Sequence, residues 1–200
     1  MFHYIEGTVT DVGPYFAVVD CGGLGFALNT TMNTLSHIKK DGTARFYVFD
    51  YIREDCFDLY GFWSKSEKRS FELLIGVSGV GPKAAISILS ASTPETLAMA
   101  ILSGDEKALT IAPGIGKKIA QRVILELKDK ISKESAGFAV PAAAPGVPVP
   151  GQDQTLTDAA AALSVLGYGT AEISAALRGV DITGRKTEDI IRAALKNMMK

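Results

Sequence analysis

A short glycine motif that occurs twice constrains this 200-residue chain more than any other sequence feature. Residues 77–83 read Val-Ser-Gly-Val-Gly-Pro-Lys, and residues 112–118 read Ala-Pro-Gly-Ile-Gly-Lys-Lys. Apolar residues recur at helical spacing before and after each copy, so each motif is expected to join two helices. Two such glycine–apolar–glycine turns predict a tandem helix-hairpin-helix domain, which we place at residues 64–134.

Both turns have the residue types that a phosphate-binding turn needs. Glycine adopts positive φ without steric cost, and the missing side chain lets a phosphate oxygen approach the backbone N–H groups. The following helix begins with unpaired N–H groups and a partial positive charge, which attract anions. The apolar residue between the glycines is expected to point inward and lock the turn. The predicted DNA-backbone contacts are Gly79, Val80, Gly81 and Lys83 in the first copy, and Gly114, Ile115, Gly116, Lys117, Lys118 and Arg122 in the second.

The charge distribution points to the same segment. The formal net charge of the whole chain is −1, which by itself does not indicate a nucleic-acid partner. Residues 64–134, however, hold 11 basic and 8 acidic side chains, whereas residues 1–63 hold 4 basic and 8 acidic ones. Binding to phosphates through the positive segment is expected to be independent of base sequence and sensitive to salt.

A nucleotide-binding P-loop is the rival interpretation of these glycines, and the sequence argues against it. That loop needs a glycine, four further residues and then Gly-Lys followed by Ser or Thr. Counting back from Gly116 gives Ile111 at the first position, and Lys118 stands where the hydroxyl residue is needed. In the first copy, Gly81 is followed by Pro82. We therefore expect no nucleotide motor in this chain.

The remaining segments predict a multidomain fold. In residues 1–63 five short extended runs within about 60 residues favour an OB-fold β-barrel. Four of the eight prolines fall in residues 135–155, which predicts a linker. Residues 156–200 predict a small three-helix, UBA-like domain. The predicted strands are Ile5–Thr10, Phe16–Asp20, Leu24–Leu28, Ala44–Ile52 and Cys56–Phe62, with a hairpin turn at 21–23, and the predicted C-terminal helices are Leu156–Leu166, Thr170–Leu177 and Lys186–Met199.

Candidate metal ligands and targeting signals are sparse. His3, His37, Cys21 and Cys56 make no compact ligand set, so we predict no metal, no cofactor and no catalytic residue. The N-terminus lacks the basic and apolar regions of a signal peptide. No window approaches 18 uninterrupted apolar residues. We therefore predict a cytoplasmic protein that does not contact membranes.

Several motifs together resemble the RuvA family, the Holliday-junction-binding subunits of the bacterial branch-migration complex. Besides the two hairpins, the matching residues are Arg53-Glu54-Asp55 leading to Leu59-Tyr60-Gly61-Phe62, and Ala162-Leu163 with Leu166-Gly167-Tyr168. The resemblance covers the chain except for residues 135–155. Glu6 departs from the pattern, since some members carry a basic residue near this position.

The resemblance implies partners and an assembly. It implies a four-fold symmetric tetramer, with one or two tetramers on a four-way DNA junction that is held open and square. It implies a RuvB-type hexameric ATPase docked through residues 156–200, allows a RuvC-type resolvase as a further partner, and places the chain in DNA recombination, repair and the SOS response. Glu54 and Asp55 are then an acidic pin, whose carboxylates repel phosphates and hold separating strands apart.

Two other functions compete with a non-catalytic scaffold. Base-excision glycosylases and nucleases also use helix-hairpin-helix elements, but a glycosylase needs a helical domain that encloses a flipped base. A single-strand-binding OB protein needs a groove of basic and aromatic side chains. The predicted barrel at the start of the chain argues against the first, and the excess of acidic residues in residues 1–63 argues against the second.

Overall fold

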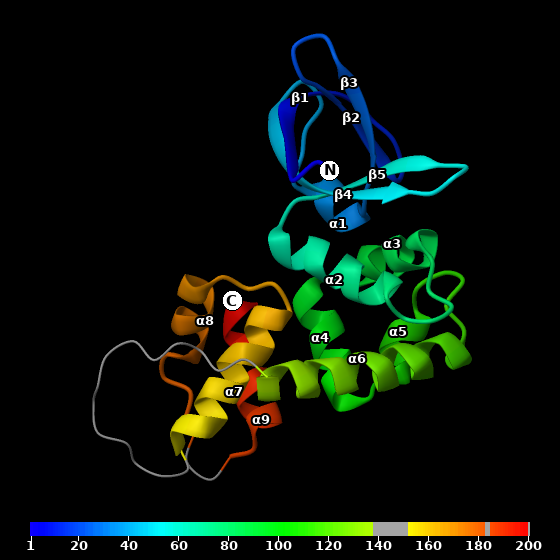
Figure 1. Ribbon diagram of the computed structural model, residues 1–200. Helices are drawn as coiled ribbons and strands as arrows, with labels where there is room; N and C mark the ends of the chain where they lie inside the picture. Colours follow the sequence, from blue (N-terminus) through cyan, green and yellow to red (C-terminus); the bar gives the residue numbers. More distant parts are fainter. Residues whose placement is uncertain (138–151, 183–184, 200) are drawn as a thin grey trace.

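The computed structural model describes residues 1–137, 152–182 and 185–199, which form three domains (Figure 1). The N-terminal domain is a closed barrel whose strands pair in the order β1-β2-β3-β5-β4. Only β3 and β5 pair in parallel. The predicted OB-fold barrel is therefore confirmed. Its strands are β1 (Tyr4–Val12), β2 (Phe16–Asp20), β3 (Gly25–Asn29), β4 (Thr43–Ile52) and β5 (Phe57–Phe62).

Alternating side chains account for the barrel. Along β4 the side chains of Ala44, Phe46 and Val48 are buried, and the residues between them are exposed or partly exposed. This is the two-residue period of a strand with one face toward a core. The predicted turn between β2 and β3 is also present, with Gly22 and Gly23 both at positive φ.

The central domain is helical, as predicted. Its α4 begins after Thr93, whose hydroxyl accepts a hydrogen bond from the Thr96 N–H group, and has Pro94 as its first residue. Along α6 the side chains of Val123 and Leu127, four residues apart, are buried in the core. The helices are α2 (Lys65–Ile75), α3 (Pro82–Ala91), α4 (Pro94–Ser103), α5 (Glu106–Thr110) and α6 (Lys117–Gly137).

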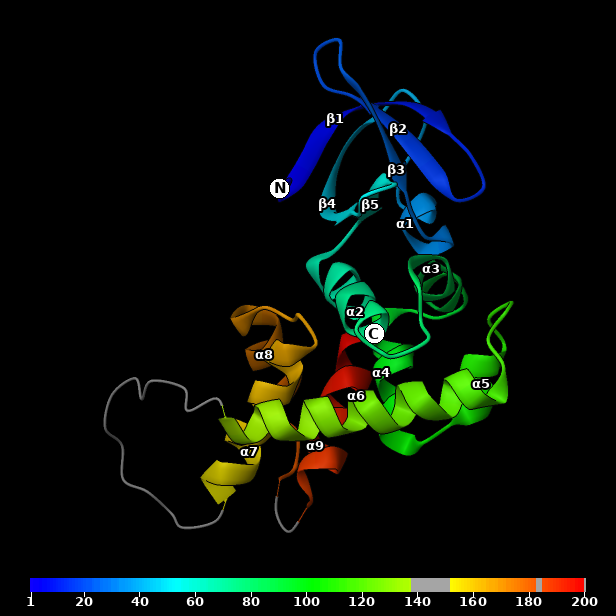
Figure 2. The ribbon, with the colours of Figure 1, turned by 45° about the vertical axis from the view of Figure 1, so that its right-hand side comes forward.

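A buried carboxylate joins the barrel to the helical domain. Helix α1 (Met32–Ser36), between β3 and β4, lies above α2 and α3 (Figure 2). Glu67 on α2 is fully buried and accepts hydrogen bonds from the hydroxyls of Thr31 and Thr34, at 2.5 and 2.6 Å, and from the Asn33 amide at 3.3 Å. Because a buried carboxylate without donors is costly, these bonds fix the barrel on the helical domain.

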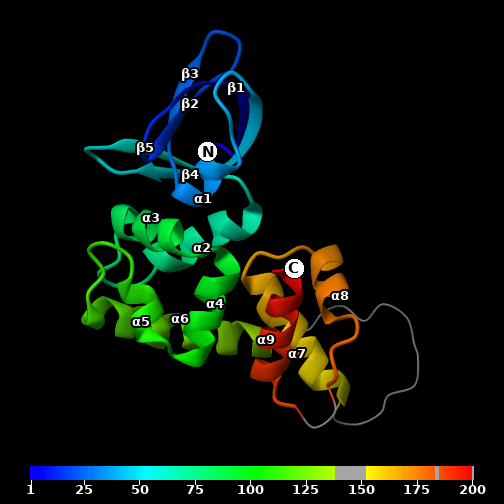
Figure 3. The same ribbon diagram turned by 180° about the vertical axis from the view of Figure 1, so that it is seen from behind.

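Three helices form the C-terminal domain, which packs against α4 and α6 (Figures 1 and 3). They are α7 (Gln152–Val165), α8 (Thr170–Leu177) and α9 (Thr187–Met198), which confirms the predicted three-helix unit. Its apolar residues belong to the same core cluster as those of the central domain; Leu163 and Ile190, for example, are fully buried.

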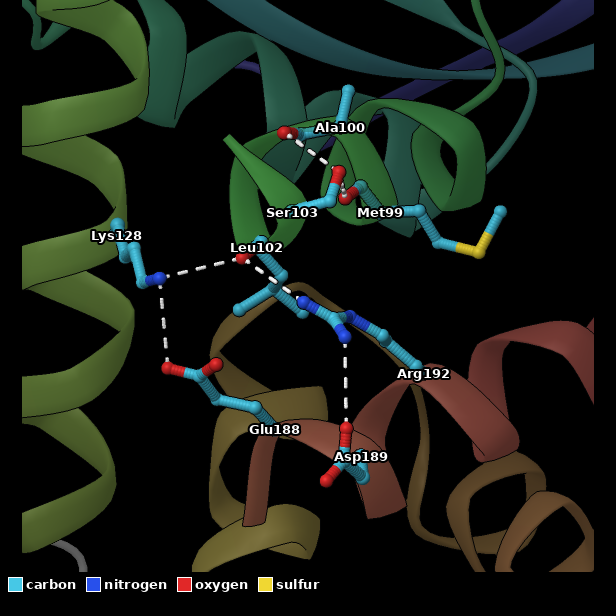
Figure 4. A network of polar contacts seen from close by, with 8 residues as sticks. All are labelled: Met99, Ala100, Leu102, Ser103, Lys128, Glu188, Asp189 and Arg192. Atoms are coloured by element: carbon cyan, nitrogen blue, oxygen red, sulfur yellow. Dashed lines mark hydrogen bonds and ion pairs between the residues drawn. The ribbon is translucent and has the colours of Figure 1, made fainter. Parts of the chain in front are cut away.

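Polar contacts fasten this domain at the end of α4 (Figure 4). Lys128 on α6 and Arg192 on α9 both donate to the carbonyl oxygen of Leu102, at 3.3 and 3.4 Å. Lys128 also pairs with Glu188 at 3.5 Å. Carbonyls at the C-terminus of a helix lack partners within the helix and carry partial negative charge, so two cations are well placed there.

Two helices extend into residues 135–155, the segment that was predicted to be a linker. Helix α6 continues to Gly137 and α7 begins at Gln152, so both enter that segment. Helix α7 is therefore longer than the predicted Leu156–Leu166. Residues 138–151 lie outside the described residues, and the domain boundaries remain predictions.

Within the described residues, no single helix is long and apolar enough to cross a bilayer. Helices α3 and α4 together have the length and apolar composition of a membrane span, but a bend of 97° separates them. Both bury most of their apolar residues in the protein core.

Candidate nucleic-acid interface

The two glycine turns have the same backbone geometry. Gly79 and Gly114, which begin the glycine–apolar–glycine triplets, have φ of 86° and 81°. One residue further on, the Val80 N–H group donates to the Val77 carbonyl at 3.0 Å, and the Ile115 N–H group donates to the Ala112 carbonyl at 3.1 Å. The predicted sequence repeat is thus also a repeat of structure, in which only the first glycine of each triplet requires positive φ.

The apolar residue of each triplet closes the turn. The side chains of Val80 and Ile115 are each 5% exposed and belong to the central core, so the prediction that they point inward is confirmed. Their N–H groups are used inside the turn. We therefore assign these two residues to holding the turn in shape, and the neighbouring glycine amides become the better candidates for phosphate contact.

The glycine amides are open. Within the described residues, the N–H groups of Gly79, Gly81, Gly114 and Gly116 have no hydrogen-bond acceptor. Gly81 has an ordinary φ of −87°, and a Cβ added at Gly81 or Gly116 would meet no atom within 4 Å. The fold itself therefore does not require glycine at these second positions, whereas close approach by an external group would.

The helix that follows the first turn lacks the cap that its neighbours have. Side chains cap the N-termini of α1, α2, α4 and α5. Helix α3 has Gly81 at the capping position and no side-chain cap. Glycine also precedes Lys117, the first residue of α6. The first N–H groups of both helices therefore remain available to an anion.

Cations surround both turns. Lys83 and Lys118 are exposed, and neither forms an ion pair within the described residues. The Lys117 ammonium lies 4.0 Å from the Glu106 carboxylate, with its side chain 75% exposed. Arg122 is exposed; its guanidinium donates to the Ser78 carbonyl of the first hairpin at 3.2 Å and lies 3.8 Å from the Glu126 carboxylate. These charges supply the positive potential that phosphate binding needs.

The predicted acidic pin lies at the tip of a protruding hairpin. Strands β4 and β5 extend away from the rest of the barrel (Figures 1 and 3). Their turn is closed by the Arg53 N–H group, which donates to the Cys56 carbonyl at 2.9 Å. Glu54 and Asp55 between them are exposed and form no salt bridge within the described part of the chain. The tip therefore presents two exposed carboxylates.

The structure brings the base of the acidic hairpin close to the first glycine turn. A cavity of about 590 Å³ separates β5 from α3, and Asp58, Tyr60 and Lys83 are among its lining residues. Burial, together with the nearby Asp58 carboxylate, raises the pKa of Tyr60 to about 12. Sequence reasoning did not single out Asp58, because its proximity to Lys83 depends on how the barrel sits on the helices.

The C-terminal domain leaves the glycine turns uncovered. Figures 1 and 3 show the turn between α5 and α6 at one end of the central domain and the C-terminal helices at the other. The contacts of that domain involve Arg69, Glu95, Leu102 and Lys128, none of which belongs to either glycine turn. Within the part of the chain that the structure describes, both hairpins are therefore accessible to a large ligand.

Comparison with known proteins gives a consistent result along the chain. Three family models match: RuvA N terminal domain over residues 1–61, SAM-like Helix-hairpin-helix tandem over residues 71–129, and RuvA, C-terminal domain over residues 154–199. The chain is also similar to proteins named Holliday junction branch migration complex subunit RuvA. That of Ruminiclostridium cellulolyticum is 44% identical over 199 residues, covering 99% of this chain and 100% of the relative. Those of Acetivibrio thermocellus and Bacteroides fragilis are 43% and 38% identical over 201 residues, covering 100% and 99% of this chain and 100% of each relative.

Proposed function

The chain belongs to the RuvA family, and on that premise we propose that it binds four-way DNA junctions through their phosphates and recruits a RuvB-type ATPase to them. One observation carries the proposal: two hairpins of equal geometry each offer free glycine amides at the start of a helix, with lysines beside them. Such groups bind phosphate and do not read bases. Sequence-independent binding to the DNA backbone follows.

The salt dependence of DNA affinity provides a quantitative test of the proposal. The contacts proposed are the amides at Gly79, Gly81, Gly114 and Gly116, with Lys83, Lys117, Lys118 and Arg122 as counter-charges. If about six phosphates are neutralised, affinity should fall on the order of a thousandfold between 50 and 200 mM salt. A much weaker dependence would indicate that the positive segment is not the DNA-binding surface.

Selection of a junction over plain duplex requires several copies of the chain. We infer a four-fold symmetric tetramer, of which one or two bind each junction and hold it open and square. Each protomer would place Glu54 and Asp55 near the junction centre, where exposed carboxylates repel the phosphates of crossing strands. With a single tetramer bound, the opposite face of the junction stays open to a RuvC-type resolvase.

The C-terminal domain is the proposed docking site for the motor. It carries a groove of about 920 Å³ between α7 and α8, whose lining is mainly apolar and includes Leu156, Ala160, Ile173 and Leu177. An apolar segment of the ATPase would bury itself there. ATP hydrolysis then belongs to the motor, and the present chain is a non-catalytic, cytoplasmic subunit without cofactor or metal.

Binding assays with matched DNA test the proposal. A four-way junction, its duplex arms and its single strands should be compared at one salt concentration, with two unrelated base sequences. We expect the junction to bind most tightly and both sequences to bind equally. Preference for single strands, or strand cleavage by the chain alone, would overturn the proposed function.

A second assay tests recruitment. A chain cut near Pro145 should still bind the junction as a tetramer but should not stimulate the ATPase. Because that cut also uncovers apolar residues of α4 and α6, the full-length variant Leu177→Glu provides a matched test within the groove. Normal stimulation of the ATPase by both variants would contradict docking through residues 156–200.

A further inference from the structure

We propose that Ser87 and Arg122 are positioning residues that aim the phosphate-binding amides, each acting on the hairpin that it does not belong to. This inference rests on the proposed DNA-binding function. It adds Ser87 to the proposed interface and gives Arg122 a second role, which is exerted through the protein backbone. It also explains how two separate turns are held as one binding surface.

The contacts are reciprocal. Ser87, on the helix that follows the first turn, donates from its hydroxyl to the Pro113 carbonyl of the second turn at 2.8 Å. Arg122, on the helix that follows the second turn, donates from Nη1 to the Ser78 carbonyl of the first turn at 3.2 Å. The same guanidinium nitrogen lies 3.4 Å from the Ser78 hydroxyl. Each helix thus holds the opposite turn.

The repeat places these contacts at equivalent positions. The register that carries Gly79 onto Gly114 also carries Ser78 onto Pro113 and Ser87 onto Arg122. The pair of hydrogen bonds therefore obeys the internal symmetry of the domain, although one donor is a short hydroxyl and the other a long guanidinium. Ser87 and Arg122 differ in type, yet they bond equivalent carbonyls from equivalent positions. This favours a role for both residues in fixing how the two turns are arranged.

The held carbonyls belong to the peptide groups of the open amides. The Ser78 carbonyl and the Gly79 N–H group share one peptide plane, as do the Pro113 carbonyl and the Gly114 N–H group. No cis peptide bond occurs in the described residues, so the carbonyl and the N–H group of each plane point in opposite directions. A donor that fixes the carbonyl therefore directs the N–H group away from itself.

A hydrogen bond to the carbonyl also makes the N–H group of the same peptide a stronger donor. Hydrogen bonds in a chain polarise one another, by roughly 10–30% per bond. Arg122 carries a positive charge, so its effect on the Gly79 amide adds to the electrostatic attraction of a phosphate. Ser87 thus serves phosphate binding through the Gly114 amide alone, and Arg122 serves it through the Gly79 amide in addition to acting as a counter-charge.

Spectroscopy of the amides is the direct test. In the full-length chain, Ser87→Ala should shift the Gly114 N–H resonance more than the Gly79 resonance, and Arg122→Lys should do the reverse. Ser87→Thr keeps the hydroxyl and should restore the Gly114 resonance toward its original position. Equal shifts of both amides in each variant, or no shift of either, would overturn the proposal.

Affinity supplies an independent readout. Loss of one neutral hydrogen bond should weaken junction binding by about 2- to 10-fold in Ser87→Ala. The slope of affinity against salt should stay the same, because serine has no charge to lose. Ser103→Ala is the matched control, since among the described residues the Ser103 hydroxyl bonds only carbonyls of its own helix α4 (Figure 4). Wild-type affinity in folded Ser87→Ala, or a reduced salt slope, would refute the positioning role.

The double variant separates this inference from the proposed function. Because both bonds set one geometry, Ser87→Ala combined with Arg122→Lys should weaken binding by less than the product of the two single effects. Simple multiplication of the effects would mean two independent contacts and would defeat the inference while leaving DNA binding intact. Failure of the wild-type chain to bind any junction would instead defeat the proposed function.

Discussion

Replacing the two glycines of the first hairpin one at a time should separate stability from DNA binding. Gly79 has φ of 86°, a conformation that costs an L residue about 1–2 kcal/mol. Gly79→Ala should therefore lower the free energy of unfolding by about that amount. Gly81 has φ of −87° and open space around the position of a Cβ. In Gly81→Ala, the poorer helix cap should lower the free energy of unfolding by about 1 kcal/mol. The lower entropy of the unfolded chain should raise it by about 0.4–1 kcal/mol, so that the two effects nearly cancel.

DNA affinity should fall in Gly81→Ala although stability hardly changes. The new methyl group would occupy the space through which a phosphate reaches the amides at the start of α3. Losing one hydrogen bond to a charged group costs about 1.5–3 kcal/mol, which corresponds to about 10- to 150-fold weaker binding. Gly79→Ala should lose affinity as well, but together with stability, because its turn is distorted.

Fluorescence anisotropy with a labelled four-way junction, measured beside thermal unfolding, checks this prediction. Gly104→Ala is the matched control: Gly104 ends α4 at φ of 72°, with open space around it and outside both hairpins. It should lower the midpoint of unfolding by about 2–8 °C without changing affinity. Wild-type affinity in folded Gly81→Ala would refute the open-amide explanation. Weakened binding in Gly104→Ala would show that affinity merely follows stability.

Three further predictions concern charge. Lys83→Ala should reduce the slope of log affinity against log salt by about 0.9 if it contacts one phosphate, whereas an unchanged slope would remove it from the interface. Neutralising the pin with Glu54→Gln and Asp55→Asn should strengthen binding to junction and duplex alike, and fluorescence energy transfer between junction arms should report a less open centre; tighter selectivity for junctions would contradict this. The raised pKa of Tyr60 means that the folded state favours the neutral phenol, so its contribution to stability is complete below about pH 10 and is lost as pH rises toward 12. Unfolding midpoints measured across that range should fall less in Tyr60→Phe than in the wild type.

Local patterns made much of the fold predictable. The strands of the barrel and the helix Thr170–Leu177 follow from alternation and helical spacing, which depend on residues close in sequence. The hairpins were recognisable because glycine has few substitutes where φ is positive, as at Gly79 and Gly114. The ends of α6 and α7 were misjudged, because a segment rich in proline and alanine gives little signal for where the flanking helices stop and start.

The parts that could not be predicted depend on distant residues. Arg122 meets a carbonyl 44 positions away, and Ser87 meets one 26 positions away. No local motif connects such positions, and the two donors do not even share a residue type. The difference between the two glycines of one triplet was equally hidden, because the sequence shows the residue but not its backbone angle. Sequence reasoning therefore singled out the amides as candidates but missed the hydrogen bonds to the carbonyls of the same peptide groups.

The barrel and the C-terminal domain contact the central domain through different kinds of interaction. This difference fits their proposed roles in holding DNA and in recruiting the motor. The barrel is joined through the buried Glu67 carboxylate, which needs its particular donors at Thr31 and Thr34 and would be left unsatisfied if they separated. The acidic pin and the hairpins should therefore move together. The C-terminal domain is held by apolar contact, together with pairs such as Lys128–Glu188, whose side chains are 39% and 47% exposed. Exposed ion pairs contribute little to stability. Apolar contact is not directional, so an apolar surface of a partner could replace that of the central domain. Binding of the motor could then displace the C-terminal domain from the central domain. The position of the acidic pin relative to the phosphate-binding turns would not change.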